Sequence, residues 1–367
     1  MTKYELSIAE NYVPGWTVVD AVRELFQNAL DQEAVDESQV MSFDLQESAI
    51  TITNQNAKLK ASSLLLGAST KLDNVTTIGQ FGEGYKLALL VLLRLGKRVV
   101  IENYGSSERW IPTLKYVPKY GTKILTVSVS KVKKVQHTNL TFAVAGLTEK
   151  DIEAIVESNL HFQIDHTETV DTPKGIILLD DRHKGKVYVS GLHICDHKYM
   201  YGYNFKPQYL KLDRDRKLVS DFDLEWLASE MWAASGSDKI IELAEAGAKD
   251  VQYIANQYMY AAPAKNVPDQ ALAQFKLKHG ERAHPVTNQT EMAELQTKSP
   301  DAKAVIVTPG LQHLIKSSQE YVEPEAVEEE EVTLAGRLAS WLDKVEGKLT
   351  KAEIAECSQI IWELNNA

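Results

Sequence analysis

A carboxylate, a carboxamide and a second carboxylate follow one another at near-helical spacing close to the start of the chain. Glu24, Asn28 and Asp31 lie in a stretch whose apolar residues recur every three or four positions. At about 100° per residue, these side chains fall within about 60° of one another, opposite the apolar arc. Such a stripe either faces water, as charged helix faces usually do, or serves a metal-bound phosphate, with Glu24 taking a proton from water and Asn28 offering oxygen to Mg²⁺.

A glycine-rich segment runs directly into an apolar stretch: Ile78-Gly79-Gln80-Phe81-Gly82-Glu83-Gly84-Tyr85-Lys86 precedes residues 87–95. Glycine allows positive φ and a close approach to a ligand, and the helix that follows presents unpaired N–H groups and a positive dipole end. This combination is typical of a phosphate site. Residues 67–77 before it resemble a loop, so a dinucleotide-binding turn, which needs a preceding strand, is disfavoured.

The elements around these residues predict an α+β class with a two-layer α/β sandwich. A helix is expected to begin at Thr17, where Asp20 completes a motif resembling a capping box. The expected elements, in order, are a helix (17–34), a hairpin (40–45 with 49–53), a helix (61–66), a buried helix (87–94) and strands near 98–103, 109–116, 123–129 and 138–143. This order differs from a βαβ series, which would give a parallel sheet.

Three motifs resemble those of one ATPase superfamily. Residues 23–31, Arg-Glu-Leu-Phe-Gln-Asn-Ala-Leu-Asp, resemble the N box of the GHKL ATPases, which include gyrase B, the ninety-kilodalton heat-shock chaperone, histidine kinases and the MutL mismatch-repair proteins. The segment 78–84 is similar to the glycine box that closes the ATP lid of that chaperone, and 67–71 resembles the preceding lid segment. Their order and spacing match the Bergerat fold, and the motifs are closest to those of the chaperone and of MutL-type proteins.

The resemblance implies a site for ATP and Mg²⁺ over residues 1–145, with a role for each matching residue. Glu24 would activate the attacking water, Asn28 would bind Mg²⁺, and Asp31 would help to hold the site. Lys71, in the lid, would reach either the nucleotide or a neighbouring carboxylate. The other expected nucleotide contacts are Gly79, Gly82 and Gly84, which would wrap the phosphates, Lys86, which would add charge, and Gln80, Phe81, Glu83 and Tyr85 beside them.

One motif departs from the family pattern. The Asp of the family's Asp-x-Gly-x-Gly box accepts a hydrogen bond from the adenine amino group, and the matching stretch here is Asn54-Gln55-Asn56-Ala57-Lys58. An Asn carbonyl still accepts that bond, but it is uncharged, and both glycines are absent. Asn54 is therefore expected at the adenine, with ATP binding that is weak, dependent on dimerisation, or changed in its base preference.

A second α+β unit is expected over residues 146–262, with a helix at 148–160, strands at 174–179 and 186–195, and helices between 221 and 259. Its strand at 187–194, followed by Leu210-Lys211-Leu212-Asp213-Arg214-Asp215-Arg216, is similar to the chaperone's middle domain and implies an S5-like transducer. Arg216, ahead of Arg214, would then touch the γ-phosphate, where a guanidinium suits the developing charge. The alternative is a solvated charge cluster over residues 213–216.

Two further features of this unit have competing interpretations. The aromatic stretch from Met200 to Phe205 either contacts a partner or is buried under the domain. His193, Cys195 and His197 alternate along one strand, but no second pair of ligands follows at a suitable spacing. A zinc site is therefore not expected there.

The rest of the chain carries no recognised chemistry. A small α/β segment is expected over 263–318, followed by an acidic linker over 319–333 that holds seven glutamates between positions 320 and 331. Residues 334–367 predict a C-terminal pair of amphipathic helices. So short a pair cannot bury its own apolar faces, so we expect it to dock on another chain or on the body of the protein.

Length and composition limit the class of protein. The 367 residues suffice for two or three domains, and 44% apolar with 25% charged residues is ordinary for a globular protein. The net charge of −11 disfavours a protein that coats nucleic acid. Two cysteines and the lack of an apolar signal core favour a cytoplasmic protein, and no apolar run approaches the roughly 20 residues of a membrane span.

These features predict an ATP-binding and slowly hydrolysing conformational switch. Mg·ATP would close the lid, two protomers would associate as a homodimer, and Arg216 would complete the site, so that a chaperone-like or MutL-like clamp holds a client, more readily a protein than a nucleic acid. One alternative is a nucleotide-binding interaction protein with little or no hydrolysis. A protein histidine kinase is less favoured, since sixteen residues before the first helix leave no room for a phosphate-accepting helical segment.

Overall fold

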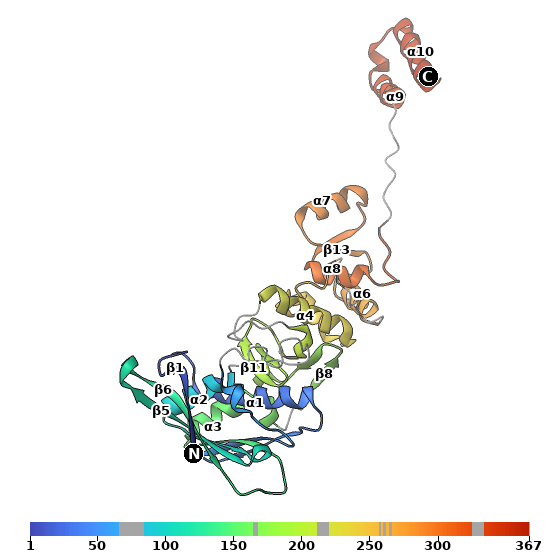
Figure 1. The fold of residues 1–367 in the computed structure, drawn as a ribbon. Coiled ribbons are helices and arrows are strands. Elements are labelled where there is room, and N and C mark those ends of the chain that lie inside the picture. The colour runs from blue at the N-terminus through green and yellow to red at the C-terminus, as the bar shows by residue number, and fades with distance from the viewer. Residues whose placement is uncertain are drawn as a thin grey trace.

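The computed structural model describes residues 1–65, 84–163, 168–210, 220–256, 258–259, 262–263, 266–324 and 334–366. A large sheet with helices on one face comes first, followed by a smaller sheet with its own helices, a small α/β unit and a helical pair (Figure 1). The α+β class and the mostly helical C-terminal part predicted from the sequence are confirmed. Within the described residues, no helix is both long and apolar enough to cross a membrane.

The first sheet has seven strands in the order β1-β6-β5-β4-β7-β3-β2, with every neighbouring pair antiparallel. Its strands are β1 (Thr2–Ala9), β2 (Met41–Gln46), β3 (Ala49–Asn54), β4 (Arg98–Asn103), β5 (Glu108–Val117), β6 (Thr122–Lys131) and β7 (Leu140–Ala145). Strand β1 was not predicted, although Tyr4, Leu6 and Ile8 alternate with polar residues, which is the pattern of a half-buried strand.

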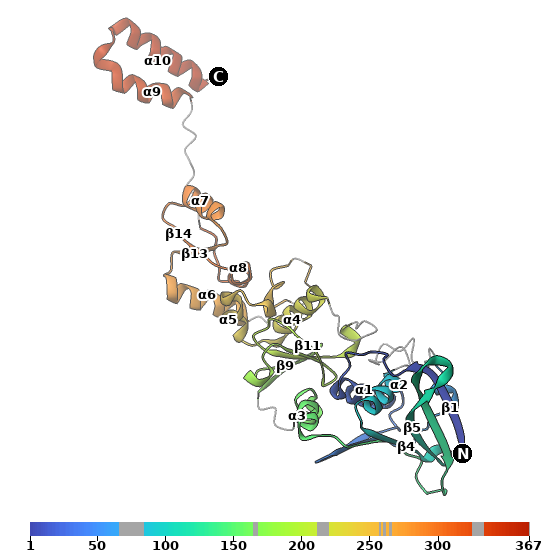
Figure 2. The ribbon, with the colours of Figure 1, turned by 90° about the vertical axis from the view of Figure 1, so that its left-hand side faces the viewer.

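Three helices cover one face of this sheet, as Figures 1 and 2 show: α1 (Val18–Val35), α2 (Gly84–Arg94) and α3 (Glu149–Glu157). Helix α1 packs against both other helices and against β3, while α2 packs against β4 and β5. The predicted two-layer sandwich is therefore confirmed. The capping box is confirmed too, because the Thr17 side chain accepts from Asp20 N, and Thr17 N donates to the Asp20 carboxylate at 2.9 Å.

The second sheet has the order β11-β10-β12-β9-β8, made of β8 (Thr169–Thr172), β9 (Gly175–Leu178), β10 (Lys186–Val189), β11 (Leu192–Asp196) and β12 (Gly202–Phe205). The single strand predicted over 186–195 is wrong. Ser190 (φ 48°) and Gly191 (φ 80°) turn the chain back, so that β10 and β11 pair as a hairpin. The aromatic stretch supplies the central strand β12, where Tyr203 and Phe205 are buried, so its burial is confirmed.

Helices α4 (Asp221–Ser235) and α5 (Lys239–Ala246) follow, separated at Gly236 within the stretch over which the sequence predicts helices. Each ends at a glycine in the left-handed conformation, Gly236 (φ 67°) and Gly247 (φ 62°), a common helix stop. The helix predicted to continue to residue 259 is therefore wrong beyond 246. In its place stands the 3₁₀ turn η7 (Lys249–Val251), which packs on α4.

The third unit consists of α6 (Asn266–His279), β13 (Ala283–Val286), α7 (Gln289–Lys298), β14 (Lys303–Ile306) and α8 (Pro309–Lys316). Helix α6 includes Pro268 in its first turn, where a missing backbone N–H is tolerated. Strand β13 pairs in parallel with β14 and was not predicted, since four residues interrupted by a proline give little periodicity. Finally, α9 (Leu334–Val345) and α10 (Lys351–Asn366) form the predicted helical pair.

Candidate functional site

Helix α1 turns its polar stripe into the protein. Glu24 is 1% exposed and Asp31 is 2% exposed, while Asn28 is half-buried. The water-facing interpretation is therefore wrong for both carboxylates. Burying a carboxylate is costly unless it is paired or hydrogen-bonded. This placement therefore indicates that the two carboxylates interact with other polar groups of the protein or with a bound ligand. Both side chains interact with other groups of the protein.

The amide of Asn28 has a defined orientation. Its Nδ2 donates to the Glu24 carbonyl oxygen, one turn earlier on α1, at 2.6 Å. Since the two ends of an amide point in different directions, this bond turns Oδ1 away from its own helix backbone. An amide oxygen is among the hard ligands that Mg²⁺ accepts, so the residues present fit a magnesium ion in ligand type.

Arg23 is a site residue to which the sequence assigned no role. Its Nη2 lies 3.6 Å from Asp20 Oδ1 and 4.0 Å from Glu24 Oε1, and the side chain is buried. Its Nε and Nη2 have no hydrogen-bond partner among the described residues. Buried guanidinium N–H groups bind anionic oxygen well, so Arg23 adds a cationic donor beside Glu24. The available signal was its position directly before Glu24 in the helix.

Helix α2, which begins at Gly84 where the glycine-rich segment ends, packs against α1. Tyr85 donates from its hydroxyl to the Ser63 carbonyl oxygen at 2.7 Å, and burial raises the pKa of Tyr85 to about 12. Lys86 is fully buried, and its ammonium group donates to the Leu65 carbonyl oxygen. Both side chains thus fix the main chain just before residue 66, at the entrance to the predicted lid.

Several predicted site residues fall outside the part of the chain that the structure describes. They are Lys71, Gly79, Gln80, Phe81, Gly82 and Glu83 in the lid and glycine segment, and Arg214 and Arg216 in the second unit. Their roles remain predictions. The structure does bring together helix α1, which carries Glu24 and Asn28, and helix α2, which begins at Gly84.

Asn54 acts as a hydrogen-bond donor at the end of β3. Its buried Nδ2 donates to the Ala29 carbonyl oxygen at 2.9 Å and to the Gln39 carbonyl oxygen at 3.0 Å. The amide therefore ties β3 to α1 and to the chain before β2. Nearby, Asn56 has φ 51°, the left-handed conformation that Asn tolerates, so the absence of glycine there does not prevent the turn.

Replacing Asn54 by Asp, the residue of the family motif, is expected to destabilise the protein. An ionised carboxylate cannot donate, so both hydrogen bonds would be lost and negative charge would lie against two carbonyl oxygens. We expect a loss of about 3 kcal/mol in the free energy of unfolding, measured by denaturant titration. Asn56→Asp is the control, because Asn56 is exposed and its bond to Ser38 O (3.1 Å) is open to water. Equal stabilities of Asn54→Asp and the wild type would contradict this role.

An aromatic cluster joins α1 to the second sheet. The buried Phe26 ring lies 5.1 Å from that of Phe43, 5.4 Å from that of Phe162 and 5.3 Å from that of His161, between centroids. His161 Nε2 in turn lies 2.9 Å from the Ser190 carbonyl oxygen, in the turn between β10 and β11. A movement of α1 would therefore displace His161 and, through it, the turn between β10 and β11 at the edge of the second sheet.

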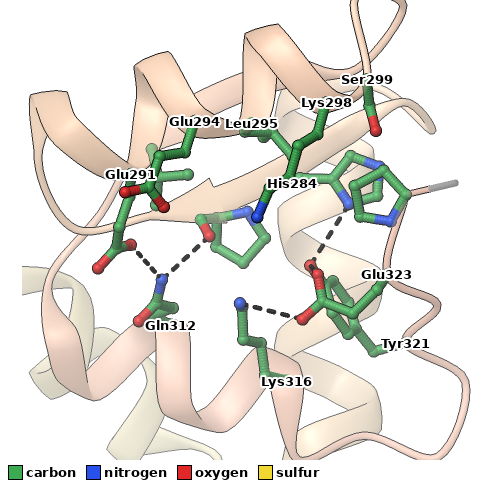
Figure 3. Close-up of a pocket in the computed structure, with 13 residues that line it drawn as sticks. His284, Glu291, Glu294, Leu295, Lys298, Ser299, Gln312, Lys316, Tyr321 and Glu323 are labelled. Carbon is green, nitrogen blue, oxygen red and sulfur yellow. Dashed lines mark hydrogen bonds and ion pairs between the residues drawn. The ribbon is translucent and has the colours of Figure 1, made fainter. Parts of the chain in front are cut away.

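A separate pocket of about 330 Å³ lies in the third unit, between α7, α8 and β13 (Figure 3). Its polar groups largely pair with one another: Gln312 Nε2 donates to Glu291 Oε2 at 2.8 Å, and Lys316 Nζ lies 3.1 Å from Glu323 Oε1. Burial lowers the pKa of His284 in this pocket. The sequence did not predict the pocket, because it depends on the unpredicted strand β13.

Comparison with known proteins gives distant matches. No family model matches the chain. A protein of Mycoplasma pneumoniae (strain ATCC 29342 / M129 / Subtype 1), described as an uncharacterized protein, is 25% identical over 215 residues, which are 56% of this chain and 86% of that protein.

Two solved structures show weak likeness. The ATPase region of Saccharomyces cerevisiae topoisomerase II matches with a TM-score of 0.30 and 11% identity, over 52% of this chain and 69% of that one. The ATPase and transducer domains of DNA topoisomerase II from Balamuthia mandrillaris match with a TM-score of 0.33 and 12% identity, over 53% of this chain and 66% of that one.

Proposed function

We propose that residues 1–145 bind Mg·ATP and that its hydrolysis drives a conformational change. The observation that carries this proposal is the buried carboxylate of Glu24, one turn before Asn28 on a helix that packs against α2. A buried general base beside an amide oxygen and a glycine-rich phosphate segment is suited to the attack of water on a phosphoryl group.

Each described residue has a distinct role in this chemistry. Glu24 accepts the proton of the attacking water, and its burial strengthens its electrostatic action, since the surroundings screen charge less than water does. Asn28, held by its bond to Glu24 O, presents its oxygen to the magnesium ion. When bound, the ion neutralises phosphate charge. Arg23 donates N–H groups to anionic oxygen next to the base.

The same proposal extends to movement. Phe26, Phe162 and His161 transmit a shift of α1 to the turn between β10 and β11, while Arg216 senses the γ-phosphate from the second unit. The protein then acts as a dimeric, chaperone-like or MutL-like clamp. Its proposed client is a protein in preference to a nucleic acid. A nucleotide-binding protein without hydrolysis is the second candidate, because the box at residues 54–58 departs from the family pattern and the Asn54 amide nitrogen is engaged by the main chain.

Calorimetric titration tests nucleotide binding directly. We expect uptake of ATP in the presence of Mg²⁺, and Asn28→Ala should weaken it about tenfold or more while removing most of its dependence on magnesium. Glu33→Ala, on another face of α1, serves as the control. GTP, titrated in parallel, shows whether Asn54 still selects adenine. A wild-type protein that takes up no nucleotide would end the proposal.

A further inference from the structure

The C-terminal helical pair exposes large apolar side chains. Trp341 on α9 is 49% exposed and Trp362 on α10 is 66% exposed. Helix α10, described over its whole length, contains no buried residue. In both views the two helices pack against each other and against no other labelled element (Figures 1 and 2). Because apolar helix faces are stable only when buried, another surface must cover this pair.

Helix α9 has two distinct apolar faces. Ala335 and Leu342, seven residues apart, are buried, and α9 packs against α10, so these two residues are assigned to the seam between the helices. The second face is a stripe with steps of four, three and four residues, which is the heptad pattern of a helix that contacts another helix. Its members are exposed or half-buried: Leu334, Leu338, Trp341 and Val345. The helix therefore presents one face to α10 and an adjacent face to a further helix.

Charges flank this stripe in a pattern that α10 complements. Arg337 and Lys344, seven residues apart on α9, have no ion-pair or hydrogen-bond partner among the described residues. Glu356 and Glu363 on α10 are also seven residues apart. Equal spacing places each pair on one side of its helix. The basic flank of α9 thus fits the acidic flank of an α10 helix.

The two charge spacings fit one antiparallel register. When α9 lies antiparallel to an α10 helix with Arg337 opposite Glu363, Lys344 falls opposite Glu356. The same alignment places Trp341 next to Ile360, an exposed apolar residue of α10. Since the seam with its own α10 is already formed by Ala335 and Leu342, the α10 in this register must come from a second chain.

We propose that the α9–α10 hairpin binds a second copy of itself and forms a four-helix bundle, with α9 of each chain against α10 of the other. The contact is two-fold symmetric, and every helix has antiparallel neighbours, the usual arrangement of such bundles. The two α9 helices are then parallel, so both chains enter the bundle at the same end. Two copies of residues 1–145 are thereby held near each other before any nucleotide binds, at a high effective concentration.

The test is the oligomeric state of the full chain in the absence of nucleotide, measured by sedimentation velocity over a range of concentrations. We expect a dimer, and Trp341→Glu should raise its dissociation constant about a hundredfold or more, because a central Trp is lost from both symmetric contacts. Leu277→Glu is the matched control: Leu277 is 90% exposed on α6 and should leave the dimer intact. A monomeric wild type is expected if the hairpin docks on the rest of its own chain, and this result would overturn the proposal. A dimer whose dissociation constant Trp341→Glu leaves unchanged would overturn it as well.

Charge reversal distinguishes loss of the ion pairs between α9 and α10 from misfolding of the hairpin. The double variant Arg337→Glu with Lys344→Glu should weaken the dimer on the order of tenfold or more, since four favourable pairs become unfavourable. Adding Glu356→Lys and Glu363→Lys should restore the affinity to within about threefold of the wild type. A quadruple variant as weak as the double variant would reject the register. Because no nucleotide is present, this experiment is independent of ATP binding.

Discussion

Replacing Glu24 by Gln is expected to abolish ATP hydrolysis while leaving nucleotide binding nearly unchanged. The amide has the shape of the carboxylate but cannot take a proton from water, and a positioned general base contributes roughly 10²–10⁴-fold to such a reaction. Because Glu24 is buried, bulk water cannot take over its role as the proton acceptor. Phosphate release in single-turnover conditions, with binding followed by calorimetry, measures the two effects separately.

Glu33→Gln is the matched control, since it makes the same chemical change at a less buried position of the same helix. Its rate should equal that of the wild type. Hydrolysis by Glu24→Gln at the wild-type rate would remove the general base from the proposal. If the wild type and Glu24→Gln both bind ATP and neither hydrolyses it, the result would instead support a nucleotide-binding protein. Transfer of labelled phosphate from ATP onto the chain would support a histidine kinase.

Replacing Asp250 by Ala is expected to destabilise the second unit by about 3–5 kcal/mol. Asp250, on η7, is buried and accepts hydrogen bonds from the Tyr203 hydroxyl at 2.6 Å, Met200 N at 2.9 Å and Tyr201 N at 3.3 Å. Without the carboxylate these donors lose their acceptor inside the protein. Denaturant titration measures the loss, and Asp238→Ala is the control because the exposed Asp238 makes no capping bond.

The contribution of Asp250 should also depend on pH. Burial raises the pKa of Asp250 above its ordinary value of 3.8. A raised pKa in the folded state means that the proton stabilises the fold fully below pH 3.8 and that this stabilisation is lost as the pH rises through the folded-state pKa. The difference in unfolding free energy between wild type and Asp250→Ala should therefore be largest at acidic pH. A difference that grows toward neutral pH would contradict the assignment.

Local signals in the sequence determined the first helix, the two-layer order and the C-terminal pair. The Thr17 and Asp20 cap, the apolar periodicity of α1 and the break at Gly236 each act within a few residues, so no other part of the chain is needed to interpret them. The same holds for the residue types of the site: a carboxylate and an amide one turn apart indicate metal-phosphate chemistry wherever the helix lies.

Tertiary structure alone decided what those residues face. Burial of Glu24 and Asp31 depends on segments distant in sequence that cover α1, and the donor role of Asn54 depends on the carbonyl groups of Ala29 and Gln39. Short strands such as β13 likewise form only because a partner strand arrives from elsewhere. Periodicity tells which side of an element is apolar, but which groups meet is fixed by long-range packing, and that packing turns a polar stripe into a buried candidate site.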